Sequence, residues 1–481
     1  MIFAISGVTR YRAGLSKEHP FGYYLAALGH VGSVPLIGSP DAIQHSLLIA
    51  RFGMYQHVGT SLWEISQLCL RQCIELGYHA PPQKPVTAIE EQKQRRIFWE
   101  CYILDRYSSG ILGRPFAIAD EDISTDLPIL ADDEALKASN VTTLSDLPNI
   151  SPSHPTEVSV FVFCIQLRQI SSHIHTEFYS GRRYHSRSAQ STPITFTSAG
   201  YVQMKVQNFL AQLDSWRQSA PVFIEPKSLY ERPEWYDFLL EKDKMTLMRG
   251  AIHTAPKLSN NSPPQDLLIH SLRSAIRVIE LYADMLEKSY ITWTRSYFQG
   301  IFAAGLSILF CISWNPDLAQ SSDIGTGVSA STALQLCSQV LHTFEREMPD
   351  VRSFAIVFDE LKDLMARKLQ HPLDRAIGHG HMTMPANQPT PDFNARQDIE
   401  WTVGDRANLQ NDDGSQNFNI HSVDPIDLGN PNIDAILLGQ QGFDWPMMTE
   451  EFMENLEAGL GEYAWGFAGD DMYHWNQLDM T

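Results

Sequence analysis

The sequence predicts an all-α protein with a multi-helix domain of roughly ten to fourteen helices and a disordered acidic C-terminal tail. Apolar residues recur at helical spacing up to about residue 370. No segment combines alternating apolar and polar residues with the turn residues of a hairpin. From His371 to about Ile433 helical spacing is lost, and Pro, Asn, Gln, Gly and Asp dominate. We therefore expect a helical domain at 1–370, a disordered linker at 371–442 and a distinct segment at 443–481.

Several expected helices have recognisable beginnings and ends. Ser61 with Glu64, and Thr87 with Glu90, have the spacing of capping boxes. Ser262, ahead of a proline and three residues before a glutamine, is the expected start of another helix. The expected helices span 3–9, 23–32, 41–55, 61–77, 87–113, 157–179, 201–216, 234–253, 262–288, 291–314, 331–347 and 350–369. Residues 132–153 are expected to form a surface loop.

The helix that starts at Thr87 is expected to be buried along its middle. Nearly every residue from Ile97 to Leu104 is apolar, so neighbours should cover this helix on all sides. Asp105 follows directly, and an unpaired charge in such a place is very costly. We expect Asp105 to pair with Arg114 or with Arg96.

The net charge is −20, and its distribution is uneven. Fourteen acidic residues and no Lys or Arg follow Arg406, so the chain up to that residue carries only −6. A body with this charge has no overall basic field, and direct DNA binding through phosphate contacts is not expected. Residues 181–198 hold the densest basic cluster, which suits nuclear import, phosphate binding or simply a solvated loop.

Metal and cofactor sites are not expected. The six cysteines are scattered without a Cys-x2-Cys pair, and Cys69 and Cys73, one helical turn apart, do not complete a tetrahedral zinc site. We interpret them as small buried residues in a reducing compartment. His379 and His381 lie beside two methionines and could contact a soft metal, but a flexible tract without a role is the simpler interpretation.

Enzyme and membrane functions are not expected either. The sequence contains no phosphate-binding glycine motif, no His-Glu-x-x-His and no Gly-x-Ser-x-Gly, and it offers no acid–base pair. Residues 296–316 carry no charged residue and are apolar enough that a membrane-spanning helix must be considered. Gln299, Gly300 and Ser307 dilute this segment, so we expect a buried core helix instead.

A series of short motifs follows the start of the helix at Thr87, within residues 87–128. An acidic turn (Asp120-Glu121-Asp122) and Leu127-Pro128 complete it. Its structural residues are Arg95, Arg96, Phe98, Trp99, Asp105, Arg106, Gly113, Arg114 and Pro115. This order and spacing resemble the middle homology domain of fungal zinc-cluster (Zn2Cys6) transcription factors. The Leu76-Gly77-Tyr78-His79 string and Leu213 to Trp216, with Pro221 after it, extend the resemblance.

The resemblance implies a nuclear transcriptional regulator whose domain at 1–370 is regulatory. The family binds DNA through six cysteines near its N-terminus, and this sequence does not show that zinc cluster. The expectation is therefore that DNA is reached through a DNA-binding partner or a homodimer, or that the N-terminus with its zinc cluster is missing only from the gene prediction that gave this sequence. The effector of the domain is unknown. Control of metabolic or secondary-metabolite genes is a further implication of the family.

The last segment, 443–481, sets nine acidic residues among large apolar ones, with no Lys or Arg. Like charges keep such a segment from collapsing alone, but it can place its aromatic groups in a partner's groove. This composition is typical of an acidic activation segment that recruits the transcription machinery or a coactivator. Its candidate contact residues are Phe443, Trp445, Phe452, Leu456, Trp465 and Trp475. The alternatives are a final helix packed on the body and, for the whole chain, a helical interaction protein without DNA binding that modulates an intact transcription factor.

Overall fold

The computed structural model describes residues 1–31, 38–56, 58–138, 144, 154–179, 198–258, 262–290, 293–320 and 327–370. These residues form thirteen α-helices and no strand, which confirms the all-α prediction. The first seven are α1 (Ile2–Arg12), α2 (Pro20–Val31), α3 (Pro40–Gly53), α4 (Leu62–Glu75), α5 (Ala88–Leu112), α6 (Asp133–Ala138) and α7 (Ser159–Phe178). The others are α9 (Ala199–Gln218), α10 (Pro233–Thr254), α11 (Gln265–Glu287), α12 (Arg295–Trp314), α13 (Ala330–Glu345) and α14 (Arg352–Gln370).

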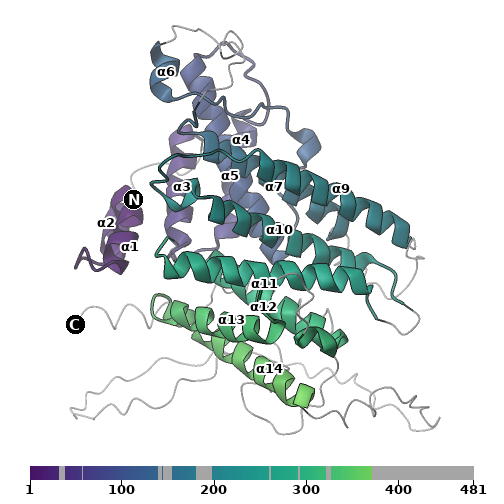
Figure 1. The fold of residues 1–481 in the computed structure, drawn as a ribbon. Coiled ribbons are helices and arrows are strands. Elements are labelled where there is room, and N and C mark those ends of the chain that lie inside the picture. The colour runs from purple at the N-terminus through teal and green to yellow at the C-terminus, as the bar shows by residue number, and fades with distance from the viewer. Residues whose placement is uncertain are drawn as a thin grey trace, which may run out of the picture.

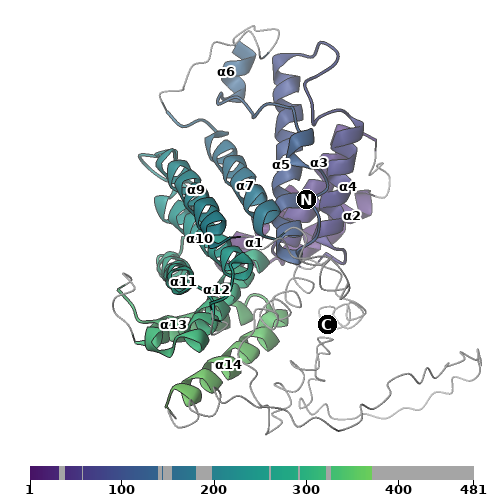
Figure 2. The same cartoon turned by 90° about the vertical axis from the view of Figure 1, so that its right-hand side faces the viewer.

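The helices are stacked roughly in chain order. α3, α4 and α5 form a bundle that packs on α7 (Figure 2). α7, α9 and α10 lie side by side, α11 crosses beneath α10, and α13 and α14 form the opposite end from α6 (Figure 1). The α1–α2 hairpin lies at one side and contacts α3. Helix α7 is thus the layer shared by the N-terminal bundle and the helices that follow.

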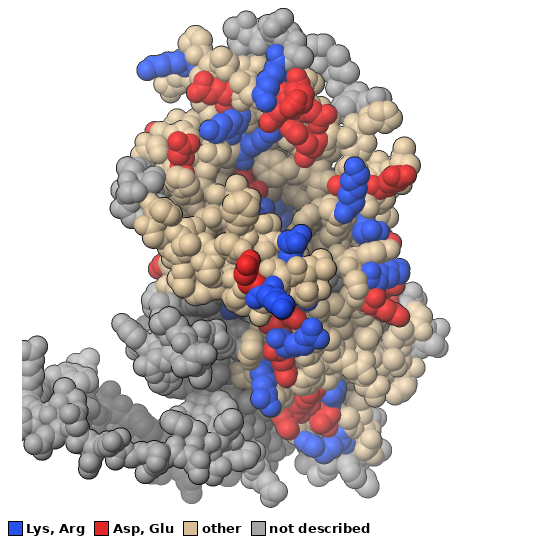
Figure 3. All heavy atoms as spheres, turned by 90° about the vertical axis from the view of Figure 1, so that its left-hand side faces the viewer, with Lys and Arg blue, Asp and Glu red and all other residues tan. Residues whose placement is uncertain are grey.

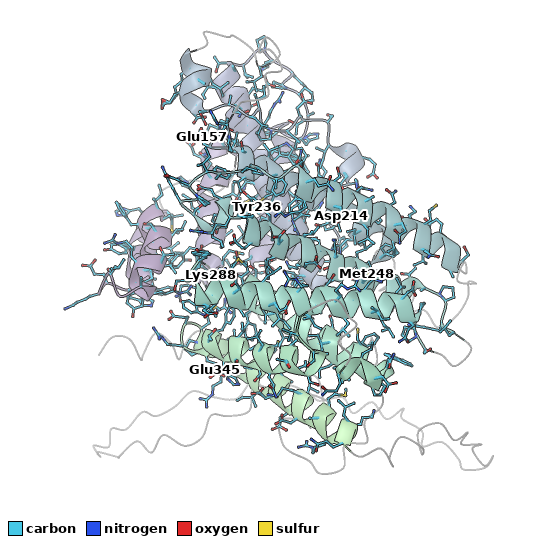
Figure 4. All side chains as sticks on the ribbon, in the orientation of Figure 1. Glu157, Asp214, Tyr236, Met248, Lys288 and Glu345 are labelled. Atoms are coloured by element: carbon cyan, nitrogen blue, oxygen red, sulfur yellow. The ribbon has the colours of Figure 1, made fainter. Side chains whose placement is uncertain are left out.

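Two hydrophobic clusters meet at this shared layer. The larger one runs through α7 and α9 to α14, and the smaller one joins α3, α4 and α5 to Ile165 of α7. Tyr236 and Met248 on α10 lie in the middle of the molecule, whereas Glu157, Lys288 and Glu345 lie toward its edges (Figure 4). Because the two clusters meet at α7, the helices pack together as one stacked body.

Helix α12 is the core helix that the sequence predicted at 291–314, shortened at its start. The hydroxyl of Thr294 accepts a hydrogen bond from the backbone N–H of Tyr297 at 3.2 Å, so the helix begins at Arg295. It is the one described helix that is long and apolar enough to span a membrane, with a mean hydropathy of 1.5 over an 18-residue stretch. However, 89% of that stretch is buried inside the protein. The prediction of a buried core helix is confirmed.

Local sequence signals placed most helix ends correctly. Ser61 and Thr87 accept hydrogen bonds from the N–H groups of Glu64 and Glu90, each at 3.4 Å. Gly113 ends α5 with φ 55°, a left-handed conformation that suits glycine. These three positions mark the start of α4 and both ends of α5, the helix that carries Arg95 to Arg106 of the motif series.

Two local predictions were wrong. The loop expected at 132–153 contains α6, whose first turn carries Asp133 and Glu134, where acidic residues favour helix formation. Ser262 does not cap α11, because the helix begins after Pro264, which supplies no side-chain cap. Consecutive prolines keep the preceding chain extended, so the helix starts only after the second one.

Several predictions fall on residues outside the described part of the chain. These are the basic cluster at 181–198, His379 and His381, the linker at 371–442 and the acidic-aromatic segment at 443–481.

Candidate functional site

The first half of the motif series fastens the segment after α5 back onto that helix. Arg95 pairs with Glu91 at 2.6 Å and with Asp126 at 3.1 Å, and it donates to the carbonyl oxygen of Leu127 at 3.0 Å. The indole N–H of Trp99 donates to the carbonyl oxygen of Asp126 at 2.9 Å. Asp126 and the Leu-Pro step of the series are therefore held by side chains from the first half of α5.

The second half is a buried cluster of charges centred on Arg106. Its guanidinium lies 2.7 Å from Asp105 and 2.9 Å from Asp120, and it donates to the hydroxyl of Ser172 at 3.0 Å. It also donates to the carbonyl oxygen of Ile118 at 2.8 Å. The side chain of Arg106 is 1% exposed and that of Asp105 is fully buried. We call Asp105, Arg106, Asp120 and Ser172 the Arg106 cluster, and it joins α5, the turn at 120–122 and α7.

The two carboxylates of this cluster respond differently to burial. Burial raises the pKa of Asp105 and outweighs the lowering effect of Arg106. Burial also acts on Asp120, but Arg106 together with hydrogen bonds from Ser172 and Tyr102 brings the pKa of Asp120 below its ordinary value. Both charges have several donors, as a buried ion pair requires.

The ion pair expected for Asp105 was wrong. Its partner is the adjacent Arg106, while Arg96 pairs with Asp133 at 2.8 Å and with Glu157 at 3.5 Å. The Arg114 guanidinium lies over the Trp63 ring, 4.4 Å from its centroid. Asp105 also accepts from Gln67 of α4 at 2.6 Å. Asp105 thus pairs with the adjacent residue, whereas Arg96 and Arg114 contact residues that are distant in sequence.

The cysteines of this region are packed in the core. Cys69, Cys73 and Cys101 are fully buried free thiols, and the sulfur atoms of Cys73 and Cys101 lie 3.7 Å apart. Burial raises the pKa of Cys101 well above its ordinary value, which keeps it a thiol. Among the described residues no group of three or more His, Cys, Asp or Glu side chains could hold a metal ion.

A groove of about 910 Å³ borders the motif series on one side of α7. Trp99, Asp126 and Leu127 form one wall, and Trp216, from the end of α9, lies on the other. Most of the remaining lining is polar and uncharged, from Gln166, Gln169, Gln212, Ser215 and Ser219. The groove brings together two stretches that the sequence had related to one family, Trp99 to Leu127 and Leu213 to Trp216.

A second, smaller cavity of about 270 Å³ lies on the other side of the Arg106 cluster. Residues of α5, α7, α10 and α12 line it, among them Tyr107, Arg168, Lys242 and Asp243. Sequence reasoning missed this cavity, because no spacing along the chain links residues that lie so far apart. We call it the α5–α12 cavity.

The charged surface gives no sign of a phosphate-binding face on the side that Figure 3 shows. There, Lys and Arg side chains are interspersed with Asp and Glu rather than gathered into one patch. A mixed surface of this kind suits a protein that does not grip the DNA backbone through the visible face.

Comparison with known proteins identifies the motif-bearing region. Residues 33–218 match the family model described as fungal specific transcription factor domain. This span contains the whole motif series and Trp216, which confirms the resemblance inferred from those residues. No solved structure matches the chain.

The chain is similar to curated transcription regulators over longer spans. It is 23% identical over 374 residues to the "Positive regulator of purine utilization" of Emericella nidulans, covering 65% of this chain and 35% of the relative. It is 23% identical over 274 residues to the "Pyrimidine pathway regulatory protein 1" of Saccharomyces cerevisiae, covering 56% and 28%. It is 32% identical over 136 residues to "Protein STB5" of the same yeast, covering 27% and 18%.

The matches thus span between about a fifth and about a third of these relatives' lengths. Proteins with this domain are transcription factors and not enzymes. Residues 33–218 therefore match a fungal specific transcription factor domain, and the chain is similar to fungal transcription regulators over this region and beyond it.

Proposed function

We propose that the chain is a nuclear transcriptional activator, in which the helical domain is the regulatory body and residues 443–481 recruit the transcription machinery or a coactivator. The observation that carries this proposal is the composition of 443–481, where nine acidic residues alternate with large apolar ones, downstream of a transcription factor domain. Acidic residues keep the aromatic groups solvated until a partner's groove accepts them. One relative is named a positive regulator, which agrees with a role in activating rather than repressing transcription.

In this proposal the helical domain does not itself contact DNA. Support comes from the net charge of −6 up to Arg406 and from the mixed surface in Figure 3. The genes controlled would belong to a metabolic pathway, since the names of two relatives refer to purine utilization and to a pyrimidine pathway.

Reporter transcription from the whole chain, fused to an unrelated DNA-binding domain, tests the activation role. Trp445, Phe452, Trp465 and Trp475 are changed together to Ala in one variant. The matched control changes aromatic residues of the linker, Phe393, Trp401 and Phe418, to Ala. We expect strong output from the native chain and the linker control, and at least a tenfold loss in the variant of 443–481.

Two results would count against the proposal. Equal output from the variant of 443–481 and the native chain would show that its aromatic groups do not recruit the machinery. No output from any fusion, with each protein present in the nucleus, would favour the alternative of an interaction protein that modulates an intact transcription factor.

A further inference from the structure

The α5–α12 cavity contains a positive charge whose counter-ion is not supplied by the described residues. Arg168 has a carboxylate partner, Asp243, at 2.9 Å, and Asp243 also accepts from Ser171 at 2.5 Å. Arg106 has its own partners in the Arg106 cluster. Lys242 differs, because within the described part of the chain its ammonium has no carboxylate within 4.0 Å and donates to the hydroxyl of Tyr107 at 2.8 Å. A partly buried ammonium without a counter-ion favours an anion beside it.

Tyr107 lies beside this ammonium and is affected by its charge. It lies between two cations, with the Lys242 ammonium 4.3 Å and the Arg168 guanidinium 5.5 Å from its ring centroid. Burial acts to raise the pKa of Tyr107, but Lys242, with smaller contributions from Ser296 and Arg168, brings this pKa below its ordinary value. Lys242 is therefore the main cation that acts on the Tyr107 hydroxyl, with Arg168 as a weaker second one.

Part of the remaining lining is apolar and can accommodate the rest of an organic molecule. Ile111, Met245, Ile252, Ala303 and Phe310 contribute to the cavity wall. A volume of about 270 Å³ equals the liquid volume of about nine water molecules, which limits a ligand to roughly a dozen non-hydrogen atoms. A charged corner with an apolar remainder is the usual form of a small-molecule site.

We propose that the α5–α12 cavity binds a small organic carboxylate, with its carboxylate at Lys242 and Tyr107 and its apolar part against Ile252 and Phe310. The regulatory consequence rests on the proposed function: the ligand would be the effector of the regulatory body. Such a ligand would touch α5, α7, α10 and α12 at once, so its binding would hold the motif helix against the later helices.

Binding to the purified full chain is measured by calorimetry with benzoate, salicylate, nicotinate and succinate. Benzamide serves as the neutral counterpart of benzoate, and inorganic phosphate as an anion without an apolar part. We expect at least one of the three ring carboxylates to bind with Kd below 1 mM, and benzamide and phosphate to bind at least tenfold more weakly. The affinity should fall as salt rises, since the contact is ionic.

Lys242→Met is compared with Lys244→Met, a matched change on the same helix at a lysine that pairs with Asp214 of α9 at 2.9 Å and lies outside the cavity lining. Lys242→Met should weaken carboxylate binding at least tenfold, and Lys244→Met should leave it unchanged. Ala303→Leu, which fills the cavity and keeps every charge, should also abolish binding. This second variant keeps the proposal testable if the Lys242→Met chain does not fold.

The proposal is overturned if none of the ring carboxylates binds the native chain, if benzamide binds as well as benzoate, or if Lys242→Met and Ala303→Leu both bind normally. These outcomes can be distinguished from a failure of the proposed activator function. Reporter output without carboxylate binding would refute the cavity ligand alone. Carboxylate binding by a chain whose reporter fusions are all silent would refute the activator role and leave the ligand site in place.

Discussion

Replacing Arg106 with Met removes the centre of the buried cluster that joins α5 to α7. The substitution keeps most of the side-chain volume but deletes the hydrogen bonds to Asp105, Asp120, Ser172 and the Ile118 carbonyl. Asp105 is then left as a fully buried carboxylate with only uncharged donors. Breaking a buried ion pair on one side typically costs about 3–5 kcal/mol, and we expect a loss in that range.

This loss can be measured by thermal and urea unfolding of the full chain. With an unfolding entropy of about 2.1 cal/mol/K per residue over roughly 370 residues, 4 kcal/mol lowers Tm by about 5 °C. The loss should also depend on pH. Without Arg106 the pKa of Asp105, already raised by burial, rises further, so the folded variant binds a proton more tightly than the unfolded chain. The variant should therefore be least impaired at low pH and lose stability as pH rises through that raised pKa.

Two further variants distinguish the cost of the unpaired Asp105 charge from a general loss of stability caused by any such substitution. Arg96→Met removes a partly exposed pair with Asp133 and should cost only about 0–1 kcal/mol. Asp105→Asn added to Arg106→Met removes the stranded charge and should recover part of the loss. A pH-independent loss below 1 kcal/mol in Arg106→Met, or no recovery in the double variant, would refute this account of the cluster.

Three smaller predictions concern other contacts. Gly305→Ala should lower the free energy of unfolding by about 1–3 kcal/mol, because a Cβ on this α12 residue would clash with the Phe358 ring of α14. Urea unfolding measures this loss, and an unchanged midpoint would contradict this close approach. The hydrogen bond with Asp359 raises the pKa of His342, so the α13–α14 contact should be fully stabilised below about pH 6.5 and weaken as pH rises through the raised pKa. His342→Asn should remove this dependence in pH-resolved hydrogen exchange, and its persistence would assign the effect elsewhere. Trp99→Phe should cost about 1 kcal/mol, through the lost indole hydrogen bond, and a neutral result by Tm would show that this bond is dispensable.

The sequence predicted the features that depend on neighbouring residues. Ser61, Thr87 and Gly113 act on backbone groups within three or four positions of themselves, so their roles could be inferred without tertiary structure. The charge-free stretch around α12 predicted a buried helix for a similar reason, since its composition leaves no polar face. The motif series was recognised from spacing alone.

The features that depend on distant residues could not be predicted. Arg106 is adjacent to Asp105, but its other partners, Ser172 of α7 and Asp120, lie 66 and 14 positions away, and no sequence spacing indicates them. The α5–α12 cavity depends in the same way on Tyr107 and Lys242, 135 positions apart. Sequence spacing predicts helices, whereas side-chain partners follow from how the helices pack.

The central claim is that this chain activates transcription in the nucleus, and acute depletion of the chain tests it most directly. Nascent transcripts would be measured within minutes of depletion, in cells expressing either the native chain or the variant with Trp445, Phe452, Trp465 and Trp475 changed to Ala. We predict that one gene set falls on depletion and is equally low in cells that carry only the variant. A set that rises on depletion, or a variant that supports full transcription, would contradict the account.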